Sequence, residues 1–167
     1  ASGDPRTRLG IRPGQKVVLI AGGSQGSLPI NRLVANCIED LLKRNDMMVF
    51  WQAGARDLEY VRTLVGHKPN VRVFDFADNF HDYYLVADLA VCRAGAMTIS
   101  ELMCFALPAI FIPLPGAAEN HQWKNAKMIE ALGGGVCLEE AEGRQKLGPL
   151  IHDLLADGRR LDAMREK

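Results

Sequence analysis

The sequence has no long hydrophobic run and no excess of charge of either sign. No apolar stretch approaches about 18 residues, the length that a membrane-spanning helix needs, so we expect no transmembrane segment. Lys and Arg together number 20, as do Asp and Glu. Because proteins that bind nucleic acid usually carry a basic excess, this balance argues against a nucleic-acid partner. No charged-then-apolar leader follows Ala1, so we expect no signal peptide.

Cysteine is scarce, and metal-binding patterns are missing. The four cysteines, at positions 37, 92, 104 and 137, form no C-x-x-C pair and lie in apolar neighbourhoods. We therefore predict buried free thiols in a reducing compartment. There is no His/Cys cluster with zinc spacing and no Asp-x-Asp motif, so we expect neither a metal site nor a cofactor.

What is present fits one soluble globular domain. The chain has 167 residues, of which 48% are hydrophobic and 24% charged. A chain of this length buries roughly 70% of its unfolded surface and needs no disulfide or metal to fold. Residues 1–15, rich in Gly, Pro and Arg, are predicted to be a lead-in segment, and residues 16–167 a single domain.

Short apolar runs alternate with longer amphipathic stretches. Strands are expected at 16–20, 47–51, 71–74, within 85–92, and at 109–112 and 136–138. Helices are expected at 28–44, 56–65, 80–86, 98–105, 122–132 and 147–164, with a break in the last at Asp157-Gly158. This order predicts an α/β fold: a Rossmann-like, doubly wound parallel sheet of about six strands with helices on both faces. In such folds ligands bind beyond the carboxyl ends of the strands.

The first loop of interest, GGSQGS at 22–27, follows the first strand. Glycines allow close approach of the backbone, and free amides at a helix start favour an anion such as phosphate. A tight turn without a ligand explains the loop equally simply. The loop also matches G-x-S-x-G, which would make Ser24 a hydrolase nucleophile with His121 as its base. Only one strand precedes it, whereas α/β-hydrolases place this elbow after several strands, so the hydrolase is a distant alternative.

The second loop, at 93–101, follows the fourth strand. The amides of Ala96, Met97 and Thr98 would hold a diphosphate, and Glu101 would accept hydrogen bonds from ribose hydroxyls. Thr98-x-x-Glu101 is also a capping box, which explains both residues without a ligand. Spacing alone leaves the two interpretations open.

The third loop, at 113–125, follows the fifth strand and is polar and aromatic where a helix begins. Its Glu119, Asn120, Gln122 and Asn125 suit the hydroxyls of a sugar. The alternative is a solvated loop with an asparagine helix cap. Three such loops at one edge of a parallel sheet favour a ligand more than any one of them does.

Taken together, four segments resemble the MurG family, the bacterial N-acetylglucosaminyltransferases of peptidoglycan synthesis. They are GGSQGS at 22–27, ADLAVCRAGAMTISEL at 87–102, LPAIFIPLP at 107–115 and ENHQWKNA at 119–126, in the family's order and at nearly its spacing. The resemblance covers roughly residues 9–165. It implies the carboxyl-terminal half of a GT-B glycosyltransferase, which binds UDP-N-acetylglucosamine without a metal.

The resemblance also assigns roles to individual residues. The matching positions are Gly23, Ser24 and Gln25 in the glycine loop; Phe76 and Ala77, whose backbone would read the uracil ring; Ala96, Met97, Thr98, Ile99, Ser100 and Glu101, which would wrap the diphosphate and ribose; and Gln122 at the sugar, supported by His121 and Asn125.

The chain departs from the family's pattern at three positions. Trp51 stands where many relatives have His, Asn120 where many have Asp, and Ser27 where Ala is common.

The larger departure is that the amino-terminal half of a GT-B enzyme is not in this chain, so no catalytic residue is expected here. The resemblance implies that an amino-terminal half binds the lipid-linked acceptor, touches the membrane and supplies the base. The full enzyme would be cytoplasmic and peripheral at the cytoplasmic face of the inner membrane. Two alternatives remain open: a nucleotide-sugar-binding module without turnover, and the donor subunit of a two-subunit N-acetylglucosaminyltransferase.

Overall fold

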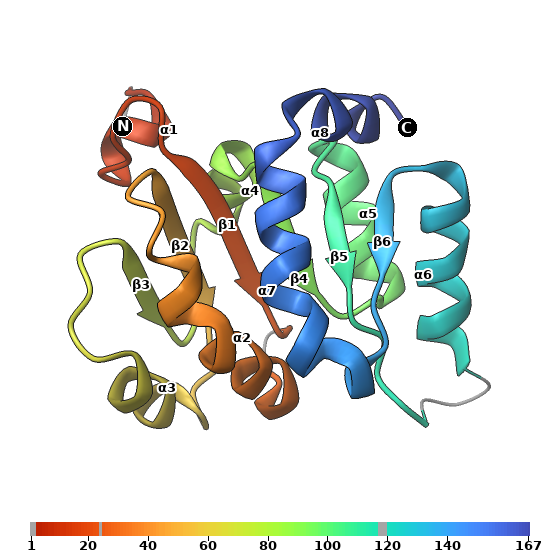
Figure 1. Cartoon of the computed structure of the whole chain (residues 1–167), viewed down its shortest axis with the longest axis horizontal. Coiled ribbons are helices and arrows are strands. Elements are labelled where there is room, and N and C mark those ends of the chain that lie inside the picture. Colours follow the sequence, from red (N-terminus) through yellow and green to blue (C-terminus); the bar gives the residue numbers. More distant parts are fainter. Residues whose placement is uncertain (1–2, 24, 117–119) are drawn as a thin grey trace.

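The protein is described here by a computed structural model that covers residues 3–23, 25–116 and 120–167. Six parallel strands form one sheet in the order β3-β2-β1-β4-β5-β6. The strands are β1 (Lys16–Ala21), β2 (Met47–Gln52), β3 (Val71–Phe74), β4 (Leu89–Cys92), β5 (Ala109–Phe111) and β6 (Gly135–Cys137). The predicted α/β, doubly wound fold is confirmed. The strand arrows run away from the ends marked N and C, so their carboxyl ends share the opposite edge (Figure 1).

Helices cover both faces of the sheet. They are α1 (Pro5–Arg8), α2 (Leu28–Leu41), α3 (Leu58–Val65), α4 (Phe80–Val86), α5 (Ala96–Cys104), α6 (His121–Leu132), α7 (Glu140–Ala156) and α8 (Gly158–Arg165). In Figure 1, α2 and α7 lie in front of the sheet, and α4 and α5 lie behind it. Within the described residues, no helix is both long and apolar enough to cross a membrane.

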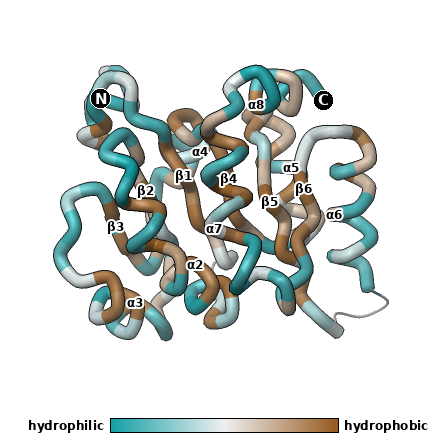
Figure 2. Tube along the Cα trace, viewed as in Figure 1, coloured by the Kyte–Doolittle hydropathy of each residue, from teal (hydrophilic) through white to brown (hydrophobic). Residues whose placement is uncertain are grey.

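Two hydrophobic clusters fix these layers, because successive side chains of a strand point to opposite faces. On β1, Val18 and Ile20 pack with α2, α3 and α7, whereas Val17 and Leu19 pack with α4, α5 and α6. All four side chains are completely buried. The central strands are accordingly apolar over most of their length, whereas the edge strand β3 carries the exposed Arg72 (Figure 2).

A buried polar network ties α2 to β2 beside the first loop. The Asn31 side chain donates to the Ala53 carbonyl and to an Asp57 carboxylate oxygen, each at 3.0 Å. Its own oxygen accepts a hydrogen bond of 2.8 Å from the Trp51 indole N–H. Asn31 and Trp51 are both fully buried. The buried indole N–H of Trp51 therefore has the partner that buried polar groups require.

The helix α7 begins at Glu140, seven residues before the start expected from the sequence. Its first turns are polar and contain Gly143, so no apolar periodicity marks them. Gly143 is buried because α2 passes close by: a Cβ atom there would lie 2.6 Å from Leu33 Cδ1.

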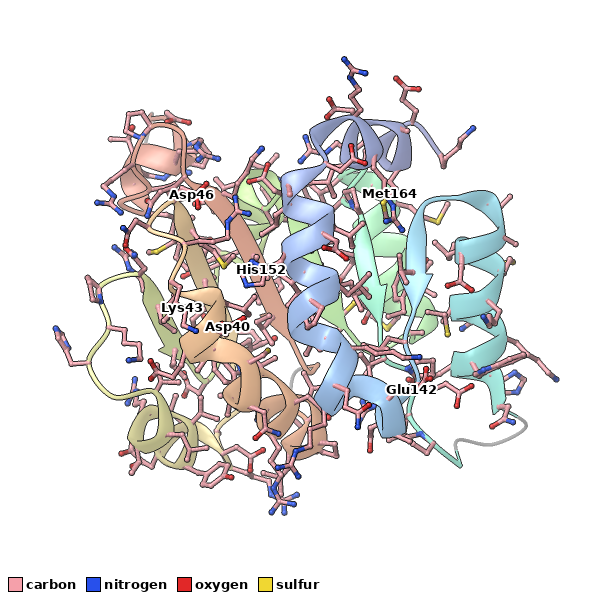
Figure 3. The ribbon with its side chains drawn as sticks, in the orientation of Figure 1. Asp40, Lys43, Asp46, Glu142, His152 and Met164 are labelled. Carbon is pink, nitrogen blue, oxygen red and sulfur yellow. The ribbon has the colours of Figure 1, made fainter. Side chains whose placement is uncertain are left out.

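Near the other end of α2, Asp40 accepts a hydrogen bond of 2.8 Å from Lys43 and faces His152 of α7 (Figure 3).

Other elements differ less from expectation. The helices α3 and α5 begin at Leu58 and Ala96 rather than at 56 and 98, and α2 ends at Leu41 rather than at 44. The prediction of buried thiols holds for Cys92, where burial raises the pKa to about 12, but it is wrong for Cys104. Cys104 lies at the exposed end of α5.

Residues 3–15 dock on the sheet's α4 side. The Asp4 side chain caps α1, Arg8 pairs with Asp82 of α4 at 2.8 Å, and Ile11 is buried in the core. The domain boundary at residue 16 stays a prediction.

Candidate functional site

A cleft of about 580 Å³ opens at the carboxyl edge of the sheet. It is lined by the ends of β1 and β2, the loop after β3, and the helices α4 and α5. Six residues expected to bind a ligand lie in its lining: Gly23, Phe76, Ala77, Met97, Thr98 and Glu101. The other lining residues are Ala21, Gln52, Asp78, Phe80, His81, Tyr84 and Phe105.

The N-terminus of α5 meets this cleft without a side-chain cap. Its N-cap residue is Gly95, and the first backbone bond runs from the Ile99 amide to the Gly95 carbonyl at 3.0 Å. The amides of Ala96, Met97 and Thr98 therefore have no partner within the helix. Since these amides lie at the positive end of the helix dipole, they favour an anion.

The capping-box interpretation of Thr98 and Glu101 is wrong. Thr98 lies inside the first turn of α5, where the Gly95 position leaves no side chain to cap the amides. Glu101 has a different partner, since its Oε2 atom accepts a hydrogen bond of 2.7 Å from the Tyr84 hydroxyl. Tyr84 is a functional candidate that sequence analysis missed.

The loop after β3 contributes an exposed aromatic ring. Phe76 is 60% exposed, although large apolar side chains are usually buried, and it lines the cleft beside Ala77. The Phe76 amide donates to the side chain of the preceding Asp75 at 2.7 Å.

The glycine loop packs tightly against the turn after β2. Gly26 has a φ of 77°, and a Cβ atom there would lie 2.1 Å from the Ala53 carbonyl oxygen. Across the contact, a Cβ atom on Gly54 would lie 2.5 Å from the Gln25 carbonyl oxygen. This close approach requires glycine on both sides. Gln25 itself does not line the cleft, and Ser24 lies outside the described residues.

The first turns of α6 hold two neighbouring loops by hydrogen bonds to their backbone. Gln122 Oε1 accepts from the amides of Leu114 and Ala94, at 3.0 and 3.4 Å. Asn125 Nδ2 donates to the Ala94 carbonyl at 3.1 Å. Neither side chain, nor that of His121, lines the cleft. Their assignment to a sugar therefore stays a prediction.

Three further expected residues lie near the cleft without lining it. Ile99 is buried in the core, Ser100 donates to the Ala96 carbonyl at 2.9 Å, and Ala96 is exposed at the helix start. Asn120 occupies the N-cap position of α6 without a side-chain cap, so the asparagine-cap interpretation is wrong. Glu119 lies outside the described residues.

Arg93 joins the loops of this edge and was not predicted to do so. Its guanidinium donates to the carbonyls of Ile112 and Pro113, at 3.1 and 3.2 Å, and to Glu140 at 2.7 Å. The second terminal nitrogen donates to Ser27 Oγ at 2.9 Å. The Arg93 side chain is only 11% exposed. Among the described residues, no group of His, Cys, Asp and Glu is placed to hold a metal ion.

The family model of the glycosyltransferase family 28 C-terminal domain matches residues 17–167. The chain belongs to glycosyltransferase family 28. Its relatives include two enzymes named UDP-N-acetylglucosamine--N-acetylmuramyl-(pentapeptide) pyrophosphoryl-undecaprenol N-acetylglucosamine transferase. The one from Salinibacter ruber is 37% identical, and the alignment covers 96% of this chain and 44% of the relative. The one from Carboxydothermus hydrogenoformans is 33% identical with the same coverage.

Two solved structures share the fold of this chain. Acinetobacter baumannii MurG superposes with a TM-score of 0.81 at 26% identity, over 96% of this chain and 47% of that one. A Listeria monocytogenes structure described as a putative UDP-N-acetylglucosamine 2-epimerase shares the fold, with a TM-score of 0.75 at 12% identity, over 99% of this chain and 42% of that one. The family 28 chain thus spans about half the length of the relatives that it matches.

We expect Arg93→Lys to lower the free energy of unfolding by about 1–3 kcal/mol, because one ammonium cannot replace both guanidinium nitrogens. Urea unfolding measures this. The matched control is Arg62→Lys, in an ion pair whose side chains are 52% and 84% exposed. The control should change stability by no more than about 0.5 kcal/mol. Equal effects of the two changes would contradict a special role for Arg93.

Proposed function

We propose that this domain binds UDP-N-acetylglucosamine, and that it is the donor-binding half of an enzyme that transfers N-acetylglucosamine to a lipid-linked muramoyl-pentapeptide. The observation that carries the proposal is the uncapped N-terminus of α5 in the cleft, with Glu101 in the second turn of the same helix. The relatives' names supply the substrate, and family 28 supplies the reaction class.

The diphosphate would lie at the start of α5. Its negative charge fits the amides of Ala96, Met97 and Thr98 and the positive end of the helix dipole. During transfer the departing UDP gains negative charge, which the same amides would stabilise. The backbone therefore does what a divalent cation does in other transferases, and the proposed binding needs no metal.

The other parts of the donor would occupy the ends of the cleft. The exposed Phe76 and the adjacent Ala77 backbone would hold the uracil ring, and Glu101 would accept from ribose hydroxyls. Gln122, His121 and Asn125 would lie at the sugar, and Gly23, Ser24 and Gln25 beside the phosphates. The hydrogen bonds of Gln122 and Asn125 to the backbone of Ala94, two residues before α5 begins, support this assignment.

The acceptor site and the base would belong to an amino-terminal half. The relatives are about twice as long as this chain, and inverting transfer needs an acceptor hydroxyl held in line with the anomeric carbon. The whole enzyme would lie peripherally at the cytoplasmic face of the membrane through that half. A donor subunit that pairs with a separate acceptor subunit would fit the same domain.

Calorimetric titration tests the proposal. UDP and UDP-N-acetylglucosamine should bind with the same affinity in EDTA as in magnesium, because backbone amides neutralise the diphosphate. ADP and NAD should bind more weakly, because the loop at Phe76 and Ala77 would select uracil. Binding that disappears in EDTA would contradict the metal-free site, and ADP binding as tight as UDP would contradict the uracil assignment.

A carboxylate at position 95 should compete with the diphosphate. The Gly95 backbone is extended, and an added Cβ atom would meet only Thr98 Oγ1 at 4.0 Å, so Asp fits as an N-cap there. We expect Gly95→Asp to keep or raise the melting temperature and to weaken UDP binding about tenfold or more. Gly95→Ala is the control, since it adds the Cβ atom without the charge and should keep UDP affinity within about threefold. Equal losses of UDP affinity in both variants would mean that steric crowding, and not charge at the helix terminus, weakens binding.

The chain alone should not transfer sugar. An oriented acceptor hydroxyl and a positioned base raise the reaction rate by many orders of magnitude, since effective molarities reach about 10⁵ M or more. An assay with UDP-N-acetylglucosamine and a lipid-linked acceptor should show turnover only when an amino-terminal half is added. Robust turnover by the chain alone would place the acceptor site or the base within these 167 residues.

A further inference from the structure

Tyr84 and Glu101 form a hydrogen bond between two helices at the wall of the cleft. Tyr84 lies on α4 and Glu101 on α5, and the Tyr84 hydroxyl approaches Glu101 Oε2 to 2.7 Å. Tyr84 is only 8% exposed, whereas Glu101 is an exposed residue. Both line the cleft. A rigid, buried donor therefore holds a carboxylate that faces solvent.

The Tyr84 ring is fixed by its aromatic neighbours. It stacks on Phe105 with ring centroids 5.2 Å apart and meets Phe80 edge to face at 4.9 Å. Burial and the hydrogen bond to Glu101 raise the pKa of Tyr84 well above its ordinary value. The hydroxyl therefore keeps its proton at physiological pH and acts as the donor in this pair.

The pair leaves half of the carboxylate available. Oε2 of Glu101 is taken by Tyr84, while Oε1 has no protein partner among the described residues. A free glutamate on a helix surface samples several rotamers, and a ligand that binds it must order it. A glutamate already held by a buried tyrosine needs no such ordering.

We propose that Tyr84 is a positioning residue for nucleotide binding, which holds Glu101 so that its second oxygen accepts hydrogen bonds from the ribose hydroxyls. This inference rests on the proposed function and deepens it. Tyr84 touches no part of the ligand through its hydroxyl and acts through Glu101. Its contribution should therefore exist only for nucleotides that carry ribose hydroxyls.

The test compares UDP with 2′,3′-dideoxy-UDP by calorimetry on the full chain. Tyr84→Phe keeps the ring and removes only the donor. It should weaken UDP binding about three- to tenfold and leave the affinity for the dideoxy analogue unchanged. Glu101→Gln should weaken UDP binding at least as much, and adding Tyr84→Phe to it should cause little further loss, because the two residues act as a unit.

Tyr83→Phe is the matched control. It makes the same chemical change one residue away, in a ring that packs against Phe50 and Phe74. Within the described part of the chain, the Tyr83 hydroxyl has no hydrogen-bond partner. This control should leave both affinities unchanged.

The outcomes separate the inference from the proposed function. UDP binding by the unmodified chain, with a loss in Tyr84→Phe that is selective for UDP, supports the inference. Equal losses of affinity for UDP and for the dideoxy analogue in Tyr84→Phe would show a merely structural role and overturn the inference. An unchanged UDP affinity in Tyr84→Phe, or a matching loss of affinity in Tyr83→Phe, would also overturn it. If the unmodified chain binds no UDP, the proposed function fails and the inference fails with it.

Discussion

The arrangement of the carboxyl edge depends on the guanidinium group of Arg93. This group joins the end of the glycine loop at Ser27, the loop after β5, and the start of α7 at Glu140. Gln122 and Asn125 form hydrogen bonds with the backbone amide and carbonyl of the adjacent Ala94. Loops far apart in the sequence are thus connected through the consecutive residues Arg93 and Ala94. The helix α5, whose N-terminus lines the cleft, begins shortly after them. Because a planar group with several donors can bond in fixed directions, the loops are held in orientation as well as in distance.

Much of the fold was predictable from the sequence because helices cover both faces of the sheet. A strand buried on both faces must be apolar throughout, so runs such as 16–21 and 47–52 stand out from their surroundings. The start of α7 could not be found in this way. There the buried residue is Gly143, which contributes no apolar side chain to a periodic pattern, and its burial follows from the position of Leu33 on another helix.

The loops that line the cleft were predictable from the sequence, but the residues that hold their side chains in place were not. Glycines and polar residues after strands marked the loops, since a parallel sheet brings these loops to one edge. Tyr84 gave no such indication, because a tyrosine in an amphipathic helix is usually a core residue. Its role depends on Glu101, which is 17 residues away. Thr98 and Glu101 fitted a capping box by spacing, but spacing does not show where a helix begins. Once α5 begins at Ala96, Thr98 cannot be its cap.

The bare start of α5 also bears on how such a domain evolves. Relative to glycine, a capping Ser or Asp at position 95 would add only about a few tenths of a kcal/mol, so it would be mildly favoured if folding alone were selected. With Gly95 at that position, the empty domain is slightly less stable than its own backbone permits. An anion bound at those amides restores the missing interaction, and the folded population then rises with ligand concentration. If that anion is the proposed nucleotide, its concentration in the cell would influence how long the protein survives proteolysis.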